Sequence, residues 1–142
     1  MKGIEKALRE HGVYIGKTTG NSMLPMLRQG RDTVIIEKAE FPLKKYDVPL
    51  YRRNDHYTLH RIIKKTKKGY IICGDNRANL ERDITDKDII GVLTGFYRDG
   101  VYVGVNDEAY VRYSKKVCRQ AYLRIAKKYL RAILRKLKII KN

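Results

Sequence analysis

Apolar residues in the middle of the chain occur in short runs separated by glycine, aspartate and asparagine. Runs of this length that are rich in valine, isoleucine, tyrosine and threonine are typical of β-strands. They predict strands over residues 33–37, 48–52, 57–64, 69–73, 88–97 and 101–105. Turns at residues 67–69 and 98–100 join the last four of these strands into two hairpins. Because proline cannot donate to a strand ladder, Pro49 places the second strand at a sheet edge.

Both ends of the chain show a helical period instead. Residues 2–10 predict a short helix that stops at Gly12. From about residue 108 to residue 140, apolar side chains form one helical stripe and basic side chains occupy the opposite face. The stripe consists of Tyr122, Ala126, Tyr129, Ile133, Leu137 and Ile140, widened by Ile125 and Leu130. The sequence therefore predicts a mostly β domain over residues 1–107 and a basic amphipathic helical tail over residues 108–142.

Charge separates the same two parts of the chain. The 142 residues carry a net charge of +17, but all 15 acidic residues lie at or before Glu108. The 12 basic residues after that point have no acidic residue among them, so the tail is expected to have partners of its own. No apolar run approaches the ~18 residues of a membrane-spanning helix. Cys73 and Cys118 match no metal or disulfide spacing, and unpaired thiols fit a reducing compartment.

Ser22 lies in a turn-rich segment that begins at Gly20 and is stiffened by Pro25. A serine hydroxyl becomes a nucleophile when a turn presents it and a base removes its proton. On its own, a serine in such a segment is better interpreted as a turn residue. The backbone N–H of Ser22 is the candidate donor to a developing oxyanion.

Two further segments supply a candidate base and acid. His60 can accept a proton near neutral pH, since an imidazole has a pKa of ~6.5. His56 does not complete a metal pair with it, because four residues of strand separate the two side chains by ~13 Å. The segment Gly74-Asp75-Asn76 ends the 69–73 strand. It is either a plain tight turn or the source of the carboxylate that orients the imidazole.

In this order along the chain, these segments resemble the signal peptidase I and LexA-like (S24/S26) serine peptidases of the Ser-His type. Ser22-Met23-x-Pro25 resembles the nucleophile segment, and Gly74-Asp75-Asn76 resembles the last conserved segment. His60-Arg61 stands where bacterial signal peptidases carry Lys-Arg and where other branches carry histidine. The resemblance covers roughly residues 14–105. No segment before Ser22 resembles the membrane-spanning anchor of typical signal peptidases. The second acid of the His type has two candidates in this sequence, Glu81 and Asp83.

The resemblance implies a strongly bent sheet that forms a partial barrel around a substrate groove. It implies a serine endopeptidase in which Ser22 forms an acyl-enzyme and His60 is the general base. Asp75 is the first choice for the orienting acid and Glu81 the second, because Glu81 is expected in a loop before the 88–92 strand. No metal or organic cofactor is implied. The substrate would be an extended peptide or preprotein segment with small residues before the cleaved bond.

The alternative is a catalytically degenerate module that only binds its partner through the basic tail. For that tail, residues 109–142, we expect peripheral contact with an anionic membrane, because apolar and basic residues share one helix. Binding to nucleic-acid phosphates and packing of the stripe against the body both stay open as alternatives. The expected location is therefore peripheral to a membrane and otherwise cytoplasmic.

Overall fold

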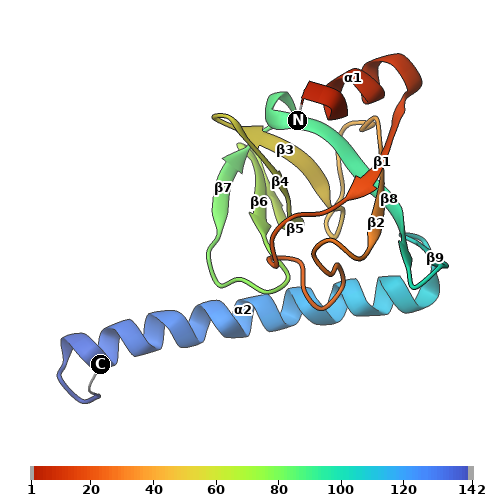
Figure 1. Cartoon of the computed structure of the whole chain (residues 1–142). Helices are drawn as coiled ribbons and strands as arrows, with labels where there is room; N and C mark the ends of the chain where they lie inside the picture. Colours follow the sequence, from red (N-terminus) through yellow and green to blue (C-terminus); the bar gives the residue numbers. More distant parts are fainter. Residues whose placement is uncertain (1, 141–142) are drawn as a thin grey trace.

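The computed structural model describes residues 2–140, which form a curled β body between two helices (Figure 1). A six-stranded sheet has the order β1-β2-β8-β3-β4, with β9 paired to β8, and a three-stranded sheet has the order β5-β6-β7. The bounds of the strands of the larger sheet are β1 Val13–Lys17, β2 Thr33–Glu37, β3 Pro49–Arg53, β4 His56–Leu59, β8 Ile89–Arg98 and β9 Val101–Gly104. Those of the smaller sheet are β5 Arg61–Thr66, β6 Gly69–Cys73 and β7 Glu81–Ile84.

The helices lie at opposite ends of the body (Figure 1). The short helix α1 (Lys2–His11) covers one end, a 3-10 turn (Asp86–Asp88) precedes β8, and the long helix α2 (Glu108–Lys136) runs beneath the other end. The mostly β fold class, the bent half-barrel and the C-terminal helix are all confirmed. Within residues 2–140, no helix has the length and apolarity needed to cross a membrane.

Two predicted features of the strands are wrong. The 57–64 run is not one strand: it bends at His60, where β4 of one sheet ends and β5 of the other begins. The strand that contains Pro49 is not at an edge, because β3 lies between β8 and β4. Pro49 is tolerated there as the first residue of β3, one position before the pairing with β4 begins at Leu50.

Two strands were not predicted, and both have weak sequence signals. β1 is only five residues long and contains a glycine, and β7 has the sequence ERDI with two exposed positions. β7 pairs with β6 through Ile72 and Glu81. This pairing lifts Glu81 out of the expected loop and sets it beside the strand that leads to Gly74.

The core continues from the sheets into the first half of α2. The helix buries the side chains Tyr110, Ser114, Val117, Cys118, Ala121 and Ile125. Cys118 packs with Cys73, Ile63 and Ile71, and both thiols are free. Burial raises the pKa of the Cys118 thiol to about 11, so this thiol stays protonated at neutral pH. The division of the chain at residue 107 stays a prediction, but residues up to Ile125 contribute to the packing of the body.

Candidate active site

Ser22 lies in a tight turn between β1 and β2 and is half-buried. Gly20 has a φ of 80°, a left-handed conformation that favours glycine just before the serine. The turn closes through a hydrogen bond from the Leu27 N–H to the Met23 carbonyl, with an N···O distance of 2.9 Å. The Ser22 N–H makes no backbone–backbone hydrogen bond within residues 2–140, which leaves it available as a donor.

Side chains and backbone from distant parts of the sequence fix this turn in place. The Arg98 guanidinium, at the end of β8, donates to the carbonyls of Pro25 and Met26 at 2.6 and 3.1 Å. The Asn76 N–H donates to the Ser22 carbonyl at 2.8 Å. The Ser22 turn and the turn after β6 are therefore held directly against each other.

Gly74 lies at the point where Ser22 and His60 approach each other. A methyl group on its Cα would stand 2.8 Å from the Ser22 carbonyl oxygen and 3.1 Å from His60 Nε2. It would also stand 2.9 Å from the Cγ of Arg77. The contact with the Ser22 backbone oxygen is too short for a carbon atom and the contact with the imidazole is tight, so glycine is the residue that fits here without displacing the serine turn. The sequence identified this glycine as part of a turn; the structure shows a steric requirement as well.

His60 occupies the corner between the two sheets and directs its two ring nitrogens to different partners. Its Nδ1 lies 3.2 Å from the Tyr51 hydroxyl and 3.4 Å from Glu81 Oε1. The Tyr51 hydroxyl lies 2.7 Å from the same Glu81 oxygen and donates to it. Nε2 faces Gly74 and the serine turn. No hydrogen bond joins the Ser22 hydroxyl to His60 in the described part of the chain, a contact that often tightens only when substrate binds.

The Tyr51 hydroxyl determines which nitrogen of His60 carries the proton. A phenol has one proton to donate, and here the Glu81 carboxylate accepts it. The 3.2 Å contact between Tyr51 and His60 then requires Nδ1–H to donate to the tyrosine oxygen. Nε2 is left with a free lone pair on the side of Ser22. This is the tautomer that a general base needs.

The pKa shifts around His60 also favour an imidazole that can accept a proton. Burial lowers the pKa of His60 below its ordinary value of 6.5, against the opposing charges of Glu81 and Asp75. A lowered pKa favours the neutral imidazole, so the ring is unprotonated at neutral pH and able to accept a proton. Burial, together with the hydrogen bond to Glu81, raises the pKa of Tyr51, so its hydroxyl keeps the proton that it donates.

Asp75 does not lie beside His60 as an orienting acid, which corrects the first choice made from the sequence. Its carboxylate forms a bidentate ion pair with Arg61, with N···O distances of 2.8 and 2.9 Å. The Tyr113 hydroxyl donates to Asp75 Oδ2 at 2.8 Å. Both charged side chains are 1% exposed. The two carboxylate oxygens are thus committed to Arg61 and Tyr113, and the acid beside His60 is Glu81, the second choice.

The Arg61–Asp75 pair ties α2 to the candidate site. Arg61 Nη1 donates to the Ser114 hydroxyl at 2.8 Å and to the Tyr46 carbonyl at 3.1 Å. Burial disfavours the charged guanidinium, but its bonds to Asp75 outweigh this cost and raise the pKa of Arg61. Arg61 is next to His60 in the sequence, and Asp75 is next to Gly74. The buried pair therefore fixes the two neighbours that face Ser22.

Tyr51 is a site residue that the sequence did not single out. It is fully buried on β3 and pairs with Thr58 of β4, two residues before His60. The only sequence signal was the predicted neighbourhood of the 48–52 and 57–64 strands. Strand pairing alone does not say which tyrosine hydroxyl reaches the imidazole, because the bend at His60 redirects the ring.

A groove leads away from Ser22 between the two ends of the larger sheet. A pocket of about 210 Å³ includes Ser22 in its lining, and a pocket of about 420 Å³ adjoins it. The residues that line both pockets are Thr18, Thr19, Tyr57 and Leu59. β1 and β4 stand at opposite ends of the strand order and supply walls of the larger pocket, which is mostly apolar. An extended peptide has an open strand edge to pair with on either side.

Comparison with known proteins indicates the family to which the chain belongs. A comparison with the curated proteins gives no match. A family profile described as Peptidase S24-like matches residues 3–94, which is more than half of the chain and includes Ser22, His60, Asp75 and Glu81. On the strength of that match, the chain belongs to the Peptidase S24-like family.

Proposed function

We propose that this protein is a serine endopeptidase that cleaves a peptide bond through an acyl-enzyme on Ser22. The observation that carries the proposal is the orientation of His60. Its protonated Nδ1 faces Tyr51 and Glu81, and its free Nε2 faces the serine turn at Gly74. Such an arrangement of acid, imidazole and serine activates a hydroxyl for attack on a carbonyl.

In the proposed reaction, Ser22 Oγ bonds to the substrate carbonyl carbon while its proton moves to His60 Nε2. The tetrahedral intermediate collapses as the C–N bond breaks, and His60 gives the proton to the departing amine. Water then attacks the ester, with His60 again taking a proton, and the acid product leaves with Ser22 restored. Glu81 stabilises the transient imidazolium, and the Ser22 N–H donates to the oxyanion.

The substrate that suits the groove is an extended peptide added to the edge of β1 or β4. The pocket beside Ser22 is the smaller one, at about 210 Å³, and the apolar pocket beyond it is about 420 Å³. We therefore propose a small residue immediately before the cleaved bond and a larger apolar residue further upstream.

A peptide library tests this function while the natural substrate is still unidentified. The protein is incubated with a mixture of unstructured peptides, and newly formed termini are identified by mass spectrometry. We expect cleavage after small residues with an apolar residue upstream, and no cleavage by the Ser22→Ala protein. The proposal is contradicted if no bond is cut in a library that places small residues in every context. The same holds if Ser22→Ala gives an identical set of products.

A further inference from the structure

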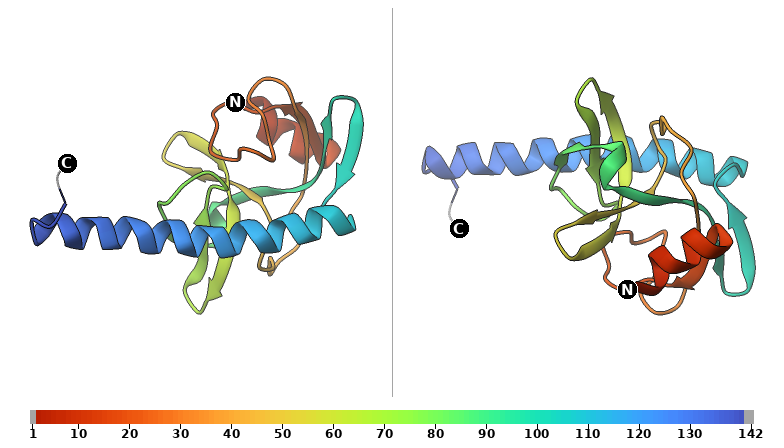
Figure 2. Two further views of the ribbon diagram at one scale, coloured as in Figure 1. Left: turned by 90° about the horizontal axis from the view of Figure 1, so that it is seen from below. Right: turned by 90° about the horizontal axis from the view of Figure 1, so that it is seen from above.

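Helix α2 continues well past the body against which it begins. Figures 1 and 2 show its C-terminal part running clear of the strands. The side chains that α2 buries all lie at or before Ile125. From Ala126 to Lys136, every residue is exposed except Leu134, which is partly buried. This projecting part of α2, with the residues that follow it up to Ile140, forms a surface with no role in the proposed catalysis.

A second apolar stripe lies on the projecting part of α2. Tyr129 is 63% exposed, Leu130 and Ile133 are each 55% exposed, and Leu137 is 64% exposed. At about 100° per residue, these four side chains point roughly 120° away from the direction of the buried face of α2. The stripe is therefore a separate apolar face that looks away from the body, and the core-facing side does not extend into it.

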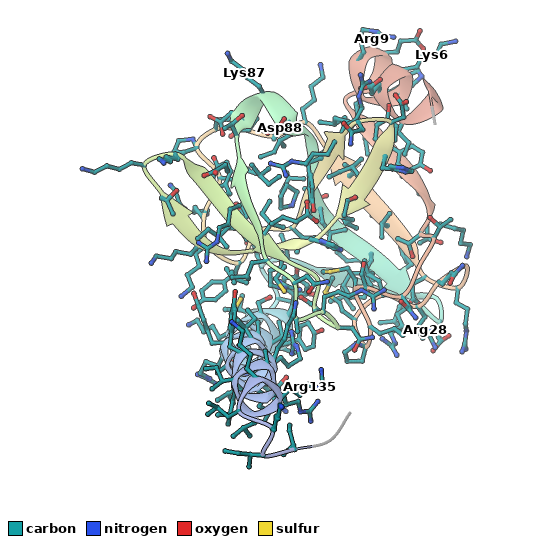
Figure 3. The ribbon with its side chains drawn as sticks, turned by 90° about the vertical axis from the view of Figure 1, so that its left-hand side faces the viewer. Lys6, Arg9, Arg28, Lys87, Asp88 and Arg135 are labelled. Carbon is teal, nitrogen blue, oxygen red and sulfur yellow. The ribbon has the colours of Figure 1, made fainter. Side chains whose placement is uncertain are left out.

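The projecting part also carries basic side chains, mostly on the face opposite the stripe, and no acidic residue accompanies them. The projecting part carries Lys127, Lys128, Arg131, Arg135, Lys136 and Lys138, and no acid follows Glu108. Figure 3 looks along α2 with the body to one side of the helix and labels Arg135 on the projecting part. Long basic side chains can bury their methylene stems beside an apolar face while the charge stays in water.

The charge and the apolar stripe of the projecting part of α2 together favour one kind of binding partner over the others. A second copy of the chain would bring two unneutralised basic surfaces together, at a like-charge cost. Nucleic acid would neutralise the charges but leave the apolar stripe in water. The surface of an anionic bilayer accommodates both, since acyl chains receive the stripe and phosphate headgroups meet the basic residues.

We propose that the projecting part of α2, residues 126–140, is an interfacial anchor that binds the surface of an anionic phospholipid bilayer. This surface is narrower than residues 109–142, because the helix up to Ile125 packs against the body. Lys141 and Asn142 lie outside the described residues. None of the residues that line the two groove pockets belongs to α2 in the described part of the chain, so the anchor leaves the groove open. The inference does not depend on peptidase activity.

Vesicle sedimentation with the full chain measures the binding. The probes are phosphatidylcholine vesicles with and without phosphatidylglycerol. We expect binding that needs the anionic lipid, because each basic residue near the surface strengthens partitioning about fivefold. Replacing Ile133 and Leu137 together by glutamine keeps the charge and should weaken partitioning at least about tenfold. Val101→Gln is the matched control: Val101 is 64% exposed on β9, which lies near the start of α2 and not near its projecting part (Figure 1), and its replacement should change nothing.

A fluorescent reporter tests which face meets the lipid. The sequence contains no tryptophan, so Tyr129→Trp introduces a single emitter on the stripe. We expect its emission to shift to the blue on anionic vesicles and to be quenched by lipids with brominated acyl chains. Tyr102→Trp, at a position that is 50% exposed on the body, should show neither effect.

Three results would overturn the inference. The first is failure of the wild-type chain to bind anionic vesicles. The second is a wild-type dimer in solution that the glutamine variant turns into a monomer, because the stripe would then be a contact between copies. The third is binding to duplex DNA that the glutamine variant loses in parallel with vesicle binding. The proposed peptidase function survives all three, because the library experiment does not use the helix surface.

Discussion

Replacing His60 with alanine is expected to lower kcat/KM for a cleaved peptide by on the order of 10⁴-fold. The substitution removes the imidazole whose Nε2 lies on the Gly74 side of Ser22. It leaves the backbone of the serine turn, which is held by Arg98 and Asn76, in place. The measurement is steady-state hydrolysis of a peptide chosen from the library.

His56→Ala provides the matched control for this effect. His56 is exposed at the start of β4, four residues before His60, and takes no part in the contacts with Tyr51 and Glu81. We expect it to retain wild-type activity. If His60→Ala keeps activity within about tenfold of wild type, a role as general base is excluded, since general bases contribute more than that.

Replacing Asp75 with asparagine is expected to destabilise the fold, and replacing Glu81 with glutamine to slow the reaction. Asp75→Asn leaves the buried Arg61 charge without its counter-ion, a loss that typically costs about 3–5 kcal/mol. For a chain of this length, that corresponds to a fall in Tm of about 10 °C or more. The measurement is thermal unfolding followed by circular dichroism.

Glu81→Gln should leave the stability nearly unchanged and slow the reaction. The Glu81 side chain is 32% exposed, and its neutral isostere can still accept the Tyr51 hydrogen bond, so Tm should change little. The loss of negative charge beside His60 removes the stabilisation of the imidazolium, and kcat should fall by about 10²-fold or more.

Asp99→Asn is the control for Asp75, because Asp99 pairs with Arg28 at a position that is 68% exposed and should contribute little to stability. If Asp75→Asn keeps the wild-type Tm, the buried pair does not have the structural role described here.

The contrast between Asp75 and Glu81 also shows what the sequence could and could not predict. Strand hairpins, the turn that carries Ser22 and the position of His60 follow from short local patterns, and the structure places these elements close to their predicted positions. The choice of acid depends on which charged neighbour each carboxylate meets. Arg61 follows His60 directly in the sequence, yet nothing local indicates that its side chain turns back into the core to bind Asp75.

The position of Glu81 could not be predicted either, because the strand that carries it shows almost no sequence signal. The residues of β7 are charged and mostly exposed, so they lack the apolar alternation by which strands are recognised. Only the pairing of β7 with β6 brings Glu81 to the imidazole. In the helical tail, the sequence pattern also does not show which apolar residues the body covers. Of the predicted stripe, Ile125 is buried, whereas Tyr122, Tyr129, Leu130, Ile133 and Leu137 are exposed. The buried face of α2 is formed mostly by other residues that come before Ile125.

Covalent labelling with a fluorophosphonate tests the central claim most directly, because this reagent phosphonylates an activated serine hydroxyl and releases fluoride. The chain contains only two serines, Ser22 and Ser114, and Ser114 is buried against Arg61 as an internal control. Peptide mapping by mass spectrometry should find the label on Ser22 alone, and labelling should be lost in His60→Ala. Absence of label on Ser22 in the folded wild-type protein, or equal labelling in His60→Ala, would contradict the proposed catalytic role of the pair.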